Sequence, residues 1–345
     1  MTHTCELHEL RGADADAFGG KSASLGELLA GGIPVPDGFA LSTSAFAAFL
    51  HHHGLAEHIH AALHGLDVHD TKAVHDAADA VGELIAAAEV PPEVRDEIAR
   101  RYAALGDDDP PVAVRSSARG EDGAEATFAG QQETYLWVRG ADGVCDAVRD
   151  CWASLYSAPA ITYRAKLGDP EADPAMGVTV QAMVDAEVSG VLFTCNPVSG
   201  DPSMVAVNAS WGLGLAVVGG EVTPDDFLVS KITGEIVRST INDKHVEHVP
   251  DPSGGGTIER AVDQERRLAP CLDEARLAEL ATLAKTVQRH FGSHQDVEWA
   301  LDREGRVHVL QARPVTTLAQ PEPATDKPVS AMSLLMGTFG AGKRS

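Results

Sequence analysis

Three features that mark membrane, secreted or zinc-binding proteins are missing from this sequence of 345 residues. No apolar run approaches the roughly 18 residues that a membrane-spanning helix needs. The first residues, MTHTCELHEL, lack the basic-then-apolar pattern of a signal peptide. The five cysteines form no C-x-x-C pair and show no zinc-ligand spacing. We therefore expect a reduced, cytoplasmic protein that has no membrane partner.

Basic residues are also scarce in this chain. Lys and Arg number 27 against 51 Asp and Glu, which gives a formal net charge of −24. This balance argues against a broad basic surface for nucleic acid and against binding to an anionic membrane. It still allows a local basic pocket for a phosphate group. The length allows two domains, or one domain of two lobes, with a sizeable core.

The order of the expected elements favours an α+β fold over a doubly wound sheet, because no β-α-β-α period is present. Helical patterns dominate residues 1–105, and strands and helices mix after that. We expect helices over the ranges 19–32, 44–64, 72–88, 142–166 and 273–291. We expect strands within the segments PVAVRSSA, QQETYLWV, GVTVQAMV, VSGVLFT, MVAVNASWG, DFLVSK and EIVRSTI.

The segment DVEWALDREGRVHVLQARPV, residues 296–315, predicts a hairpin with polar groups gathered on one face. In the first strand, alternation places Asp296 and Glu298 on one face and Trp299 on the other. With an even-numbered loop, the two carboxylates face Gln311 and Arg313. We expect four side chains of the second strand to share one face: Val307, Val309, Gln311 and Arg313.

The segment FGGKSASLG contains G-K-S and invites comparison with a phosphate-binding P-loop. The full pattern, G-x-x-x-x-G-K-[ST], requires glycine where this chain has Ala15, so a Walker nucleotide site is not expected. Two interpretations of Lys21 stay open on this segment alone. It is either a solvated lysine in the first helical turn or a phosphate ligand that acts with the backbone N–H groups of that turn.

The segment VAVRSSA predicts a buried strand that ends in polar residues. Arg115 is either an exposed arginine at an ordinary strand end or a group delivered to the edge of a sheet. The Gly-rich sequence that follows, RGEDGAEATFAG, includes Thr127 and Gly130. Such a loop can close its backbone N–H groups over phosphates, and we interpret it as a mobile lid.

Two further segments have a plain interpretation and a functional one. The strand GVTVQAMV is either core or the floor of a cleft whose backbone groups bind an adenine edge. Histidines are frequent between His51 and His75, and His60 and His64 are four residues apart. No cysteine or second cluster accompanies them, so we interpret them as a polar helix face and not as a metal site.

Several long sequence motifs occur together, in the order in which they occur in one known protein family. They are GGKSASLGEL with GIPVPDGF, AVRSSARGEDGAEATFAGQQETYL, SGVLFTCNPVSGD, WGLGLAVVGGEVTPDDF and DVEWALDREGRVHVLQARPV. Across residues 7–317 the chain resembles the N-terminal ATP-binding domain of the phosphoenolpyruvate synthase and pyruvate phosphate dikinase family. The same domain occurs in rifampicin phosphotransferase and as a separate subunit of phenylphosphate synthase. The resemblance implies an ATP-grasp-like fold of two lobes with ATP in the cleft between them.

The resemblance also implies a nucleotide site for ATP and Mg²⁺. Its residues are Lys21, Arg115, Thr127, Gly130, Gln181, Met183, Val184, Glu298, Gln311 and Arg313. We expect three cationic side chains to bind the phosphates and to act in catalysis: Lys21, Arg115 and Arg313. Gln181 and the backbone at 183–184 are expected to contact adenine. Glu298 and Gln311 are expected to bind Mg²⁺ as hard oxygen ligands.

Two positions in this pattern need separate interpretation. Asp296 is either a third metal ligand or a residue that supports the ligands. Family members usually have G-L-G-E where this chain has Gly212-Leu213-Gly214-Leu215. The missing carboxylate weakens a metal or ribose contact, while ATP binding is expected to survive.

The expected function is that of the ATP-binding subunit of a split dikinase, similar to pyruvate, water dikinase and to phenylphosphate synthase. It would transfer a phosphoryl group from Mg·ATP, with AMP and phosphate as products, to a histidine on a partner polypeptide. No Ser-His-Ala segment of the kind that carries this histidine in the family occurs here. The final acceptor is expected to be pyruvate, a phenol or another small molecule. The alternatives are a catalytically silent nucleotide-sensing subunit and a self-sufficient ATP-grasp ligase that forms ADP.

The expected domain boundaries divide the chain into three parts. Residues 1–182 form an N-terminal lobe with the phosphate-binding strand and loop. Residues 183–318 form a C-terminal lobe with the metal site. Residues 319–345 form a Pro-rich linker and a tail. The apolar segment VSAMSLLMGTFG in this tail either folds back on the core or docks the partner.

Overall fold

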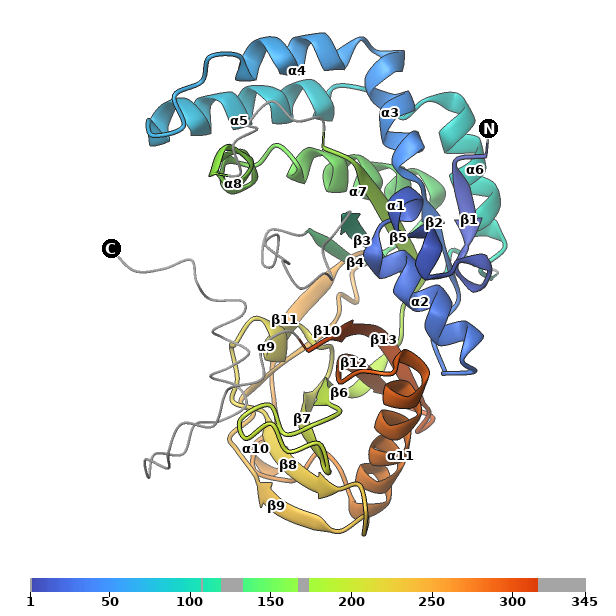
Figure 1. Ribbon diagram of the computed structural model, residues 1–345, viewed down its shortest axis with the longest axis vertical. Coiled ribbons are helices and arrows are strands. Elements are labelled where there is room, and N and C mark those ends of the chain that lie inside the picture. Colours follow the sequence, from blue (N-terminus) through green and yellow to red (C-terminus); the bar gives the residue numbers. More distant parts are fainter. Residues whose placement is uncertain (1, 107, 119–132, 167–173, 316–345) are drawn as a thin grey trace. The chain divides into compact units, whose positions relative to one another are not determined.

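The computed structural model describes residues 2–106, 108–118, 133–166 and 174–315, which divide into two compact units (Figure 1). The N-terminal unit comprises the described residues of 1–26, 37–121 and 125–183, and the C-terminal unit comprises those of 27–36 and 184–345. The loop residues Thr127 and Gly130 and the tail 319–345 lie outside the described residues. The assignment of the two units to lobes of a nucleotide-binding fold stays a prediction.

The N-terminal unit contains a five-stranded sheet with the order β1-β2-β5-β3-β4, in which each neighbouring pair is antiparallel. The strands are β1 (Thr4–Glu6), β2 (Gly38–Leu41), β3 (Val112–Ala118), β4 (Thr134–Val138) and β5 (Met176–Ala182). Side chains alternate between the two faces of such a sheet. One face therefore carries Phe39, Val114 and Val180 into a large apolar core, and the other face is left for polar groups.

Helices cover the apolar face of this sheet (Figure 1). They are α3 (Thr43–His52), α4 (Leu55–Leu63), α5 (Thr71–Ala86), α6 (Pro92–Ala103), α7 (Ala141–Ser154) and α8 (Ala158–Lys166). The rings of Phe46 and Phe49 pack against Trp152 with centroids 5.7 and 5.0 Å apart. The remaining N-terminal elements are η1 (Leu7–Glu9), η2 (Gly12–Asp14), α1 (Ala15–Phe18) and α2 (Gly20–Ala30).

Two predicted helices are each broken into two. The predicted helix 44–64 is interrupted at Gly54, which has φ 61° and so takes a left-handed conformation that ends α3. The predicted helix 142–166 stops after Ser154 and restarts at Ala158. Pro159 explains this break, because its ring lacks an N–H group and clashes with the preceding turn. Helix α6 and strands β1 and β2 were not predicted from the sequence.

The C-terminal unit contains a six-stranded antiparallel sheet with the order β13-β12-β6-β7-β8-β9. Its strands are β6 (Ala186–Phe193), β7 (Met204–Trp211), β8 (Asp225–Ser230), β9 (Ile236–Thr240), β12 (Gln295–Asp302) and β13 (Val307–Pro314). A separate hairpin pairs β10 (Val246–Pro250) with β11 (Thr257–Ala261), and this hairpin was not predicted. The short helices are α9 (Leu215–Val218) and α10 (Gln264–Arg267). The mixture of helices and strands is as expected.

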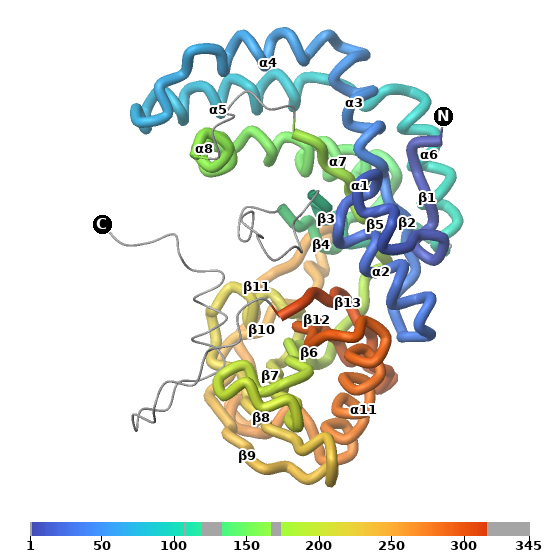
Figure 2. The backbone as a smooth tube through the Cα atoms, viewed as in Figure 1, coloured from blue at the N-terminus to red at the C-terminus, as the bar shows by residue number. Residues whose placement is uncertain are grey.

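One long helix, α11 (Glu274–Phe291), packs on one face of this sheet (Figure 1). Its buried stripe consists of Leu277, Leu280, Ala281, Ala284 and Val287. Gly292 ends the helix with φ 71°, as the sequence predicted. Segment 27–36 also belongs to this unit and lies beside the β12–β13 hairpin, where Val309 N–H donates to the Pro34 carbonyl at 2.7 Å (Figure 2). The helix leaves the opposite sheet face for the polar residues of the hairpin.

Candidate functional site

The β12–β13 hairpin places four polar side chains on one sheet face. Asp296 lies directly opposite Arg313, and Glu298 lies directly opposite Gln311. Directly opposed residues of an antiparallel pair project to the same face with Cβ atoms about 5 Å apart. The predicted pairing of the two carboxylates with Gln311 and Arg313 is therefore confirmed, but the even-numbered loop from which it was predicted is wrong, because Leu301 pairs with Val307 and leaves an odd loop.

The prediction that Val307 and Val309 share this face is wrong. The register shifts after Glu298, so that Trp299 pairs with Val309 and Leu310 is left as an extra residue. A β-bulge of this kind moves the following side chains to the other face. Val307 and Val309 consequently join Trp299 on the face that α11 covers. The bulge thus separates a packed apolar half of β13 from its polar half.

The charges at the end of the hairpin are compensated within the hairpin itself. Arg313 donates from Nε to Asp296 Oδ2 at 2.9 Å, and a terminal guanidinium nitrogen lies 2.8 Å from the same oxygen. Asp296 is buried, whereas Glu298 is half-buried. Glu298 and the buried amide of Gln311 offer two adjacent oxygen ligands. Mg²⁺ commonly takes one or two protein oxygens and completes its shell with waters and substrate phosphates, so this donor pair fits such an ion.

In the N-terminal unit, Arg115 and Gln181 both project to the sheet face opposite the core. Arg115 pairs with Thr179 across the β3–β5 ladder, and Gln181 pairs with Ala113 in the same ladder. Gln181 is 2% exposed, and its Nε2 has no hydrogen-bond partner among the described residues. The Met183 N–H donates to the Pro111 carbonyl at 2.9 Å. Val184, also predicted to line the adenine site, is buried and belongs to the C-terminal unit.

Lys21 is not a solvated surface residue. Only 5% of it is exposed, and its Nζ donates to the Ser116 carbonyl at 3.0 Å. The residue before the helix, Gly19, approaches β3 so closely that an added Cβ would lie 2.0 Å from the Ser117 carbonyl oxygen. Gly19 also has φ 83°, which side chains rarely adopt. Glycine at this position therefore lets the first turn of α2 sit directly on the strand.

Three buried hydroxyls fix the first turn of α2 to the sheet. The Ser22 N–H donates to Ser117 Oγ at 3.2 Å, and Ser22 Oγ lies 2.7 Å from Thr179 Oγ1. All three residues are fully buried. Ser117 and Thr179 are on the same sheet face as Arg115, so this network brings the turn that carries Lys21 to that face. This network was not predicted, because in the sequence Ser22 is only part of G-K-S and Thr179 only an alternating polar residue.

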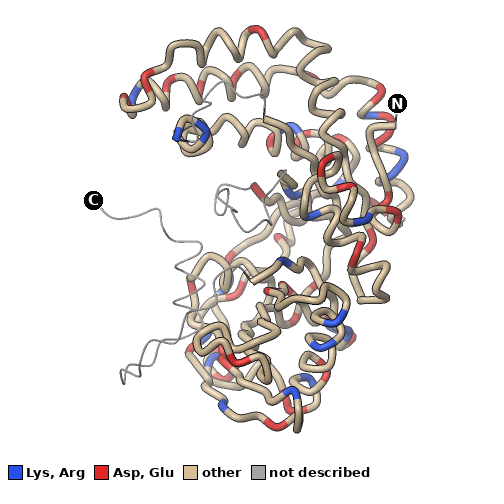
Figure 3. The backbone as a smooth tube through the Cα atoms, in the orientation of Figure 1, with Lys and Arg blue, Asp and Glu red and all other residues tan. Residues whose placement is uncertain are grey.

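No other arrangement of metal-ligating side chains stands out in the part of the chain that the structure describes. Among those residues, no group of three or more His, Cys, Asp or Glu side chains could hold a metal ion. The rings of His60 and His64 stack with centroids 5.5 Å apart. Lys and Arg are scattered along both units (Figure 3). Of the described helices, none is long and apolar enough to cross a bilayer.

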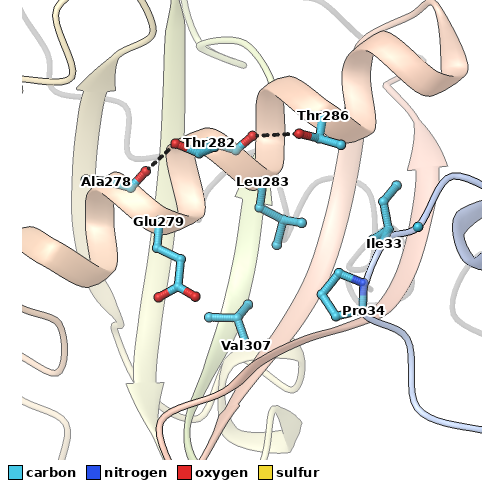
Figure 4. Close-up of a pocket in the computed structure, with 9 residues that line it drawn as sticks. Ile33, Pro34, Ala278, Glu279, Thr282, Leu283, Thr286 and Val307 are labelled. Atoms are coloured by element: carbon cyan, nitrogen blue, oxygen red, sulfur yellow. Dashed lines mark hydrogen bonds between the residues drawn. The ribbon is translucent and has the colours of Figure 1, made fainter.

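A groove of about 530 Å³ lies between α11 and segment 32–34 of the C-terminal unit (Figure 4). Leu283, Ile33, Pro34 and Val307 contribute apolar side chains. Its acidic residue, Glu279, pairs with Arg276 at 2.7 Å. Val307 belongs to the sheet face opposite Glu298, so the groove is separate from the polar residues of the hairpin. Its lining has no convergent polar groups that would suit catalysis.

Comparisons with curated proteins identify relatives of this chain. It is 41% identical over 339 residues to a probable phosphoenolpyruvate synthase of Methanothermobacter thermautotrophicus, covering 97% of this chain and 49% of the relative. It is 36% identical to the phosphoenolpyruvate synthase of Pyrococcus furiosus, covering 97% of this chain and 46% of the relative. The chain therefore spans about half the length of the curated relatives it matches.

Among solved structures, D-alanyl-alanine synthetase A from Vibrio cholerae is similar with a TM-score of 0.27 and 10% identity, over 69% of this chain and 54% of that one. This likeness is too distant to bear on the fold. The sequence also matches the family described as "Pyruvate phosphate dikinase, AMP/ATP-binding domain" over residues 15–332. That match covers nearly the whole chain, in agreement with the order of its motifs, and the protein accordingly belongs to the pyruvate phosphate dikinase AMP/ATP-binding domain family.

Proposed function

We propose that this chain is the ATP-binding part of a dikinase. It binds Mg·ATP and donates a phosphoryl group to a histidine on a separate polypeptide, so that ATP, water and histidine give AMP, phosphate and phosphohistidine. The observation that carries the proposal is the polar face of the β12–β13 hairpin, with Glu298 opposite Gln311 and Arg313 paired to Asp296. Family membership and the names of the relatives support the same chemistry.

The metal-binding role is assigned to Glu298 and Gln311. Their side chains present a carboxylate and an amide oxygen side by side, the ligand types that Mg²⁺ prefers. When bound, Mg²⁺ neutralises phosphate charge and fixes the orientation of the polyphosphate. Asp296 is assigned to hold Arg313, because the ion pair already occupies one of its carboxylate oxygens. Arg313 then meets the phosphates with its guanidinium already oriented.

The phosphate-binding role of the N-terminal unit is assigned to Lys21 and Arg115. Lys21 is buried beside β3, and the hydroxyl network limits the movement of its helical turn. Phosphoryl transfer depends chiefly on positioning and on charge neutralisation, and these two cations would neutralise phosphate charge. Gln181 is assigned to bind adenine, since its buried Nε2 has no hydrogen-bond acceptor among the described residues. At Met183 the N–H is already bonded, so the carbonyl is the group left to meet adenine.

The acceptor chemistry is assigned to a region outside the two units described. The relatives are about twice as long as this chain, and their unmatched half has room for an acceptor domain. The names of these relatives make pyruvate the first candidate for the final acceptor. A phenol or another small molecule is the alternative that the family resemblance suggests. ATP-grasp geometry is part of the same proposal, as is the assignment of the two units to its two lobes.

The nucleotide product tests this function. The purified chain is mixed with Mg·ATP, with and without the part of the Methanothermobacter relative that this chain does not match, and the nucleotides are separated by chromatography. We expect AMP and an acid-labile phosphohistidine on the added polypeptide, and slow turnover when it is omitted. ADP as the product would instead indicate a ligase. ATP binding with no turnover in either mixture would indicate a nucleotide-sensing subunit.

A further inference from the structure

Two buried polar side chains of β7 share the sheet face of Glu298, and each has an oxygen that bonds to no described residue. Glu298 lies opposite Val191 of β6, and Val191 lies opposite Asn208 of β7, so these residues form one row across the sheet. Ser210 follows two positions later on the same face. Asn208 is 1% exposed and Ser210 is 0% exposed. Neither Asn208 Oδ1 nor Ser210 Oγ has a hydrogen-bond partner among the described residues.

The orientation of the Asn208 amide is fixed by its neighbour on β8. Asn208 Nδ2 donates to Asp226 Oδ2 at 3.2 Å, directly across the β7–β8 pair. Asp226 is in turn held by Arg238, whose nearest guanidinium nitrogen lies 2.7 Å from Oδ1. An ionised carboxylate can only accept, so the amide must present its nitrogen to Asp226. Asn208 Oδ1 is therefore directed away from Asp226 as a preoriented acceptor.

The Ser210 hydroxyl has no hydrogen-bond partner across the β6–β7 pair among the described residues. Its opposite residue, Ser189, donates to the Gly212 carbonyl at 2.6 Å. The Ser189 proton is thus committed elsewhere. A buried polar group without a partner destabilises the folded state. Two such groups lie on one face of β7, and one of them, Asn208, is in the same row as Glu298. They therefore indicate a ligand-binding position.

We propose that Asn208 and Ser210 bind the ribose diol of the nucleotide, with Asp226 and Arg238 as positioning residues for Asn208. This inference rests on the proposed ATP-binding function and adds residues that the motif comparison did not assign. Two strand spacings separate Glu298 from Asn208, roughly 10 Å between backbones, a span that one nucleotide can bridge from its metal-bound phosphates to its ribose. Asn208 Oδ1 accepts from one hydroxyl, and Ser210 Oγ exchanges a hydrogen bond with the neighbouring one.

The test compares nucleotide affinity with stability. Calorimetry measures the affinity of the whole chain and of its Ser210→Ala and Asn208→Ala variants for Mg·ATP, Mg·2′-deoxyATP and Mg·3′-deoxyATP, and thermal unfolding is measured without ligand. Loss of one buried hydrogen bond should weaken Mg·ATP binding about tenfold in each variant. For each variant, one of the two deoxy analogues lacks the hydroxyl that the removed side chain contacts. The variant and the wild type should bind that analogue with equal affinity. Ser210→Ala should not lower the unfolding temperature, because its hydroxyl bonds to nothing in the free protein.

Ser230→Ala is the matched control on β8. Its hydroxyl accepts from the N–H groups of Ile232 and Thr233, so this variant should lose stability and keep its affinity for ATP. Unchanged ATP affinity in both β7 variants would overturn the ribose assignment while the proposed function stands. An equal loss for all three nucleotides would also overturn it, in favour of a water on the metal as the donor. Failure of the wild type to bind ATP would overturn the proposed function itself.

Discussion

Arg313 reaches one oxygen of Asp296 with two guanidinium nitrogens, at 2.9 Å from Nε and 2.8 Å from the terminal nitrogen, across the β12–β13 pair. The arginine is thus oriented before any nucleotide arrives. We expect Asp296→Asn to slow phosphoryl transfer at least about tenfold and to leave the Mg²⁺ requirement unchanged. Steady-state rates over a range of Mg²⁺ concentrations check this.

Asp185→Asn is the control for that substitution. Asp185 pairs with Arg303 at 2.8 Å, but both side chains are about half exposed, so its loss should have no effect on the rate. A rise in the Mg²⁺ concentration needed for half-maximal rate in Asp296→Asn would identify Asp296 as a metal ligand and would refute its assigned positioning role.

The hydroxyl network under α2 makes a second prediction. Thr179→Val keeps the shape of the side chain and removes the hydroxyl that lies 2.7 Å from Ser22 Oγ. The turn that carries Lys21 should loosen, and the Kd for Mg·ATP should rise about tenfold, since a buried hydrogen bond is worth about 1–2 kcal/mol. Thr179→Ser restores the hydroxyl and should restore the affinity. Equal affinity of the Val variant and the wild type would show that the network does not act on the nucleotide site.

That Asp296 and Glu298 share one face could be predicted, because acidic and apolar residues alternate from Asp296 to Trp299. Their pairing with Gln311 and Arg313 was predicted for an even loop, whereas Leu301 pairs with Val307 and the loop is odd; the bulge at Leu310 compensates for this difference. The bulge at Leu310 could not be predicted, because no glycine or turn residue marks it. The bulge follows from two features of the folded hairpin: Val309 is buried beside Trp299, and Gln311 lies on the opposite face.

Long-range contacts also could not be predicted from the sequence. Ser22 and Thr179 are 157 positions apart, and only the sheet brings them together. The helix breaks are different, since Gly54 and Pro159 are both visible in the sequence. Buried apolar residues occur on both sides of each break, so the apolar pattern alone does not reveal the interruption. Helix α11, with one stripe and one terminal glycine, shows no such conflict, and its predicted range is confirmed.

The ion pair between Lys244 and Asp225 makes a third prediction, on stability. Both side chains are 0% exposed, and Asp225 also accepts from the backbone N–H groups of Asn242 and Cys271 at 3.0 Å. Lys244→Met leaves a buried carboxylate without its cation and should lower the free energy of unfolding by about 3–5 kcal/mol. Denaturant titration measures this change.

Lys72→Met is the matched control for the buried pair. Lys72 pairs with Asp76 at 2.7 Å on α5, with side chains 84% and 64% exposed. Water already solvates both charges, so this substitution should leave the free energy of unfolding nearly unchanged. Similar effects of the two lysine substitutions would contradict the difference in burial on which this prediction depends.

Asp302 predicts a specific loss of stability in acid. Burial alone would raise its pKa, but hydrogen bonds from His308 and Arg306 outweigh this effect and lower the pKa from 3.8 to about 2. A group whose pKa is lower in the folded state stabilises the fold above the unfolded value, and that stabilisation disappears as the pH falls towards about 2. The wild type should therefore be more stable than Asp302→Asn at pH 5, and the difference should shrink between pH 4 and pH 2. Denaturant titrations at these pH values measure it; a difference independent of pH would contradict the assignment.

The proposed role of the hairpin predicts that two variants fold normally and fail in function. Glu298 and Arg313 project to the polar face, whereas Val297 and Trp299 provide the packing on the other side. Both variants should therefore keep the circular dichroism of the wild type. Glu298→Ala should also keep its unfolding temperature, whereas Arg313→Ala should unfold at a lower temperature because it leaves the buried Asp296 carboxylate without its cation. Phosphoryl transfer should fall by at least two to three orders of magnitude, as it does when a charge-stabilising contact is removed from such sites.

Calorimetric titration of the purified chain with ATP, in the presence and absence of Mg²⁺, tests whether Glu298 on the polar face of the hairpin helps to bind Mg·ATP. We expect saturable binding of Mg·ATP by the wild type, strong dependence on Mg²⁺, and loss of that dependence in the folded Glu298→Ala variant. Absence of binding by the folded wild type would refute the proposed function, and equal binding by wild type and Glu298→Ala at every Mg²⁺ concentration would refute the metal-binding role of Glu298.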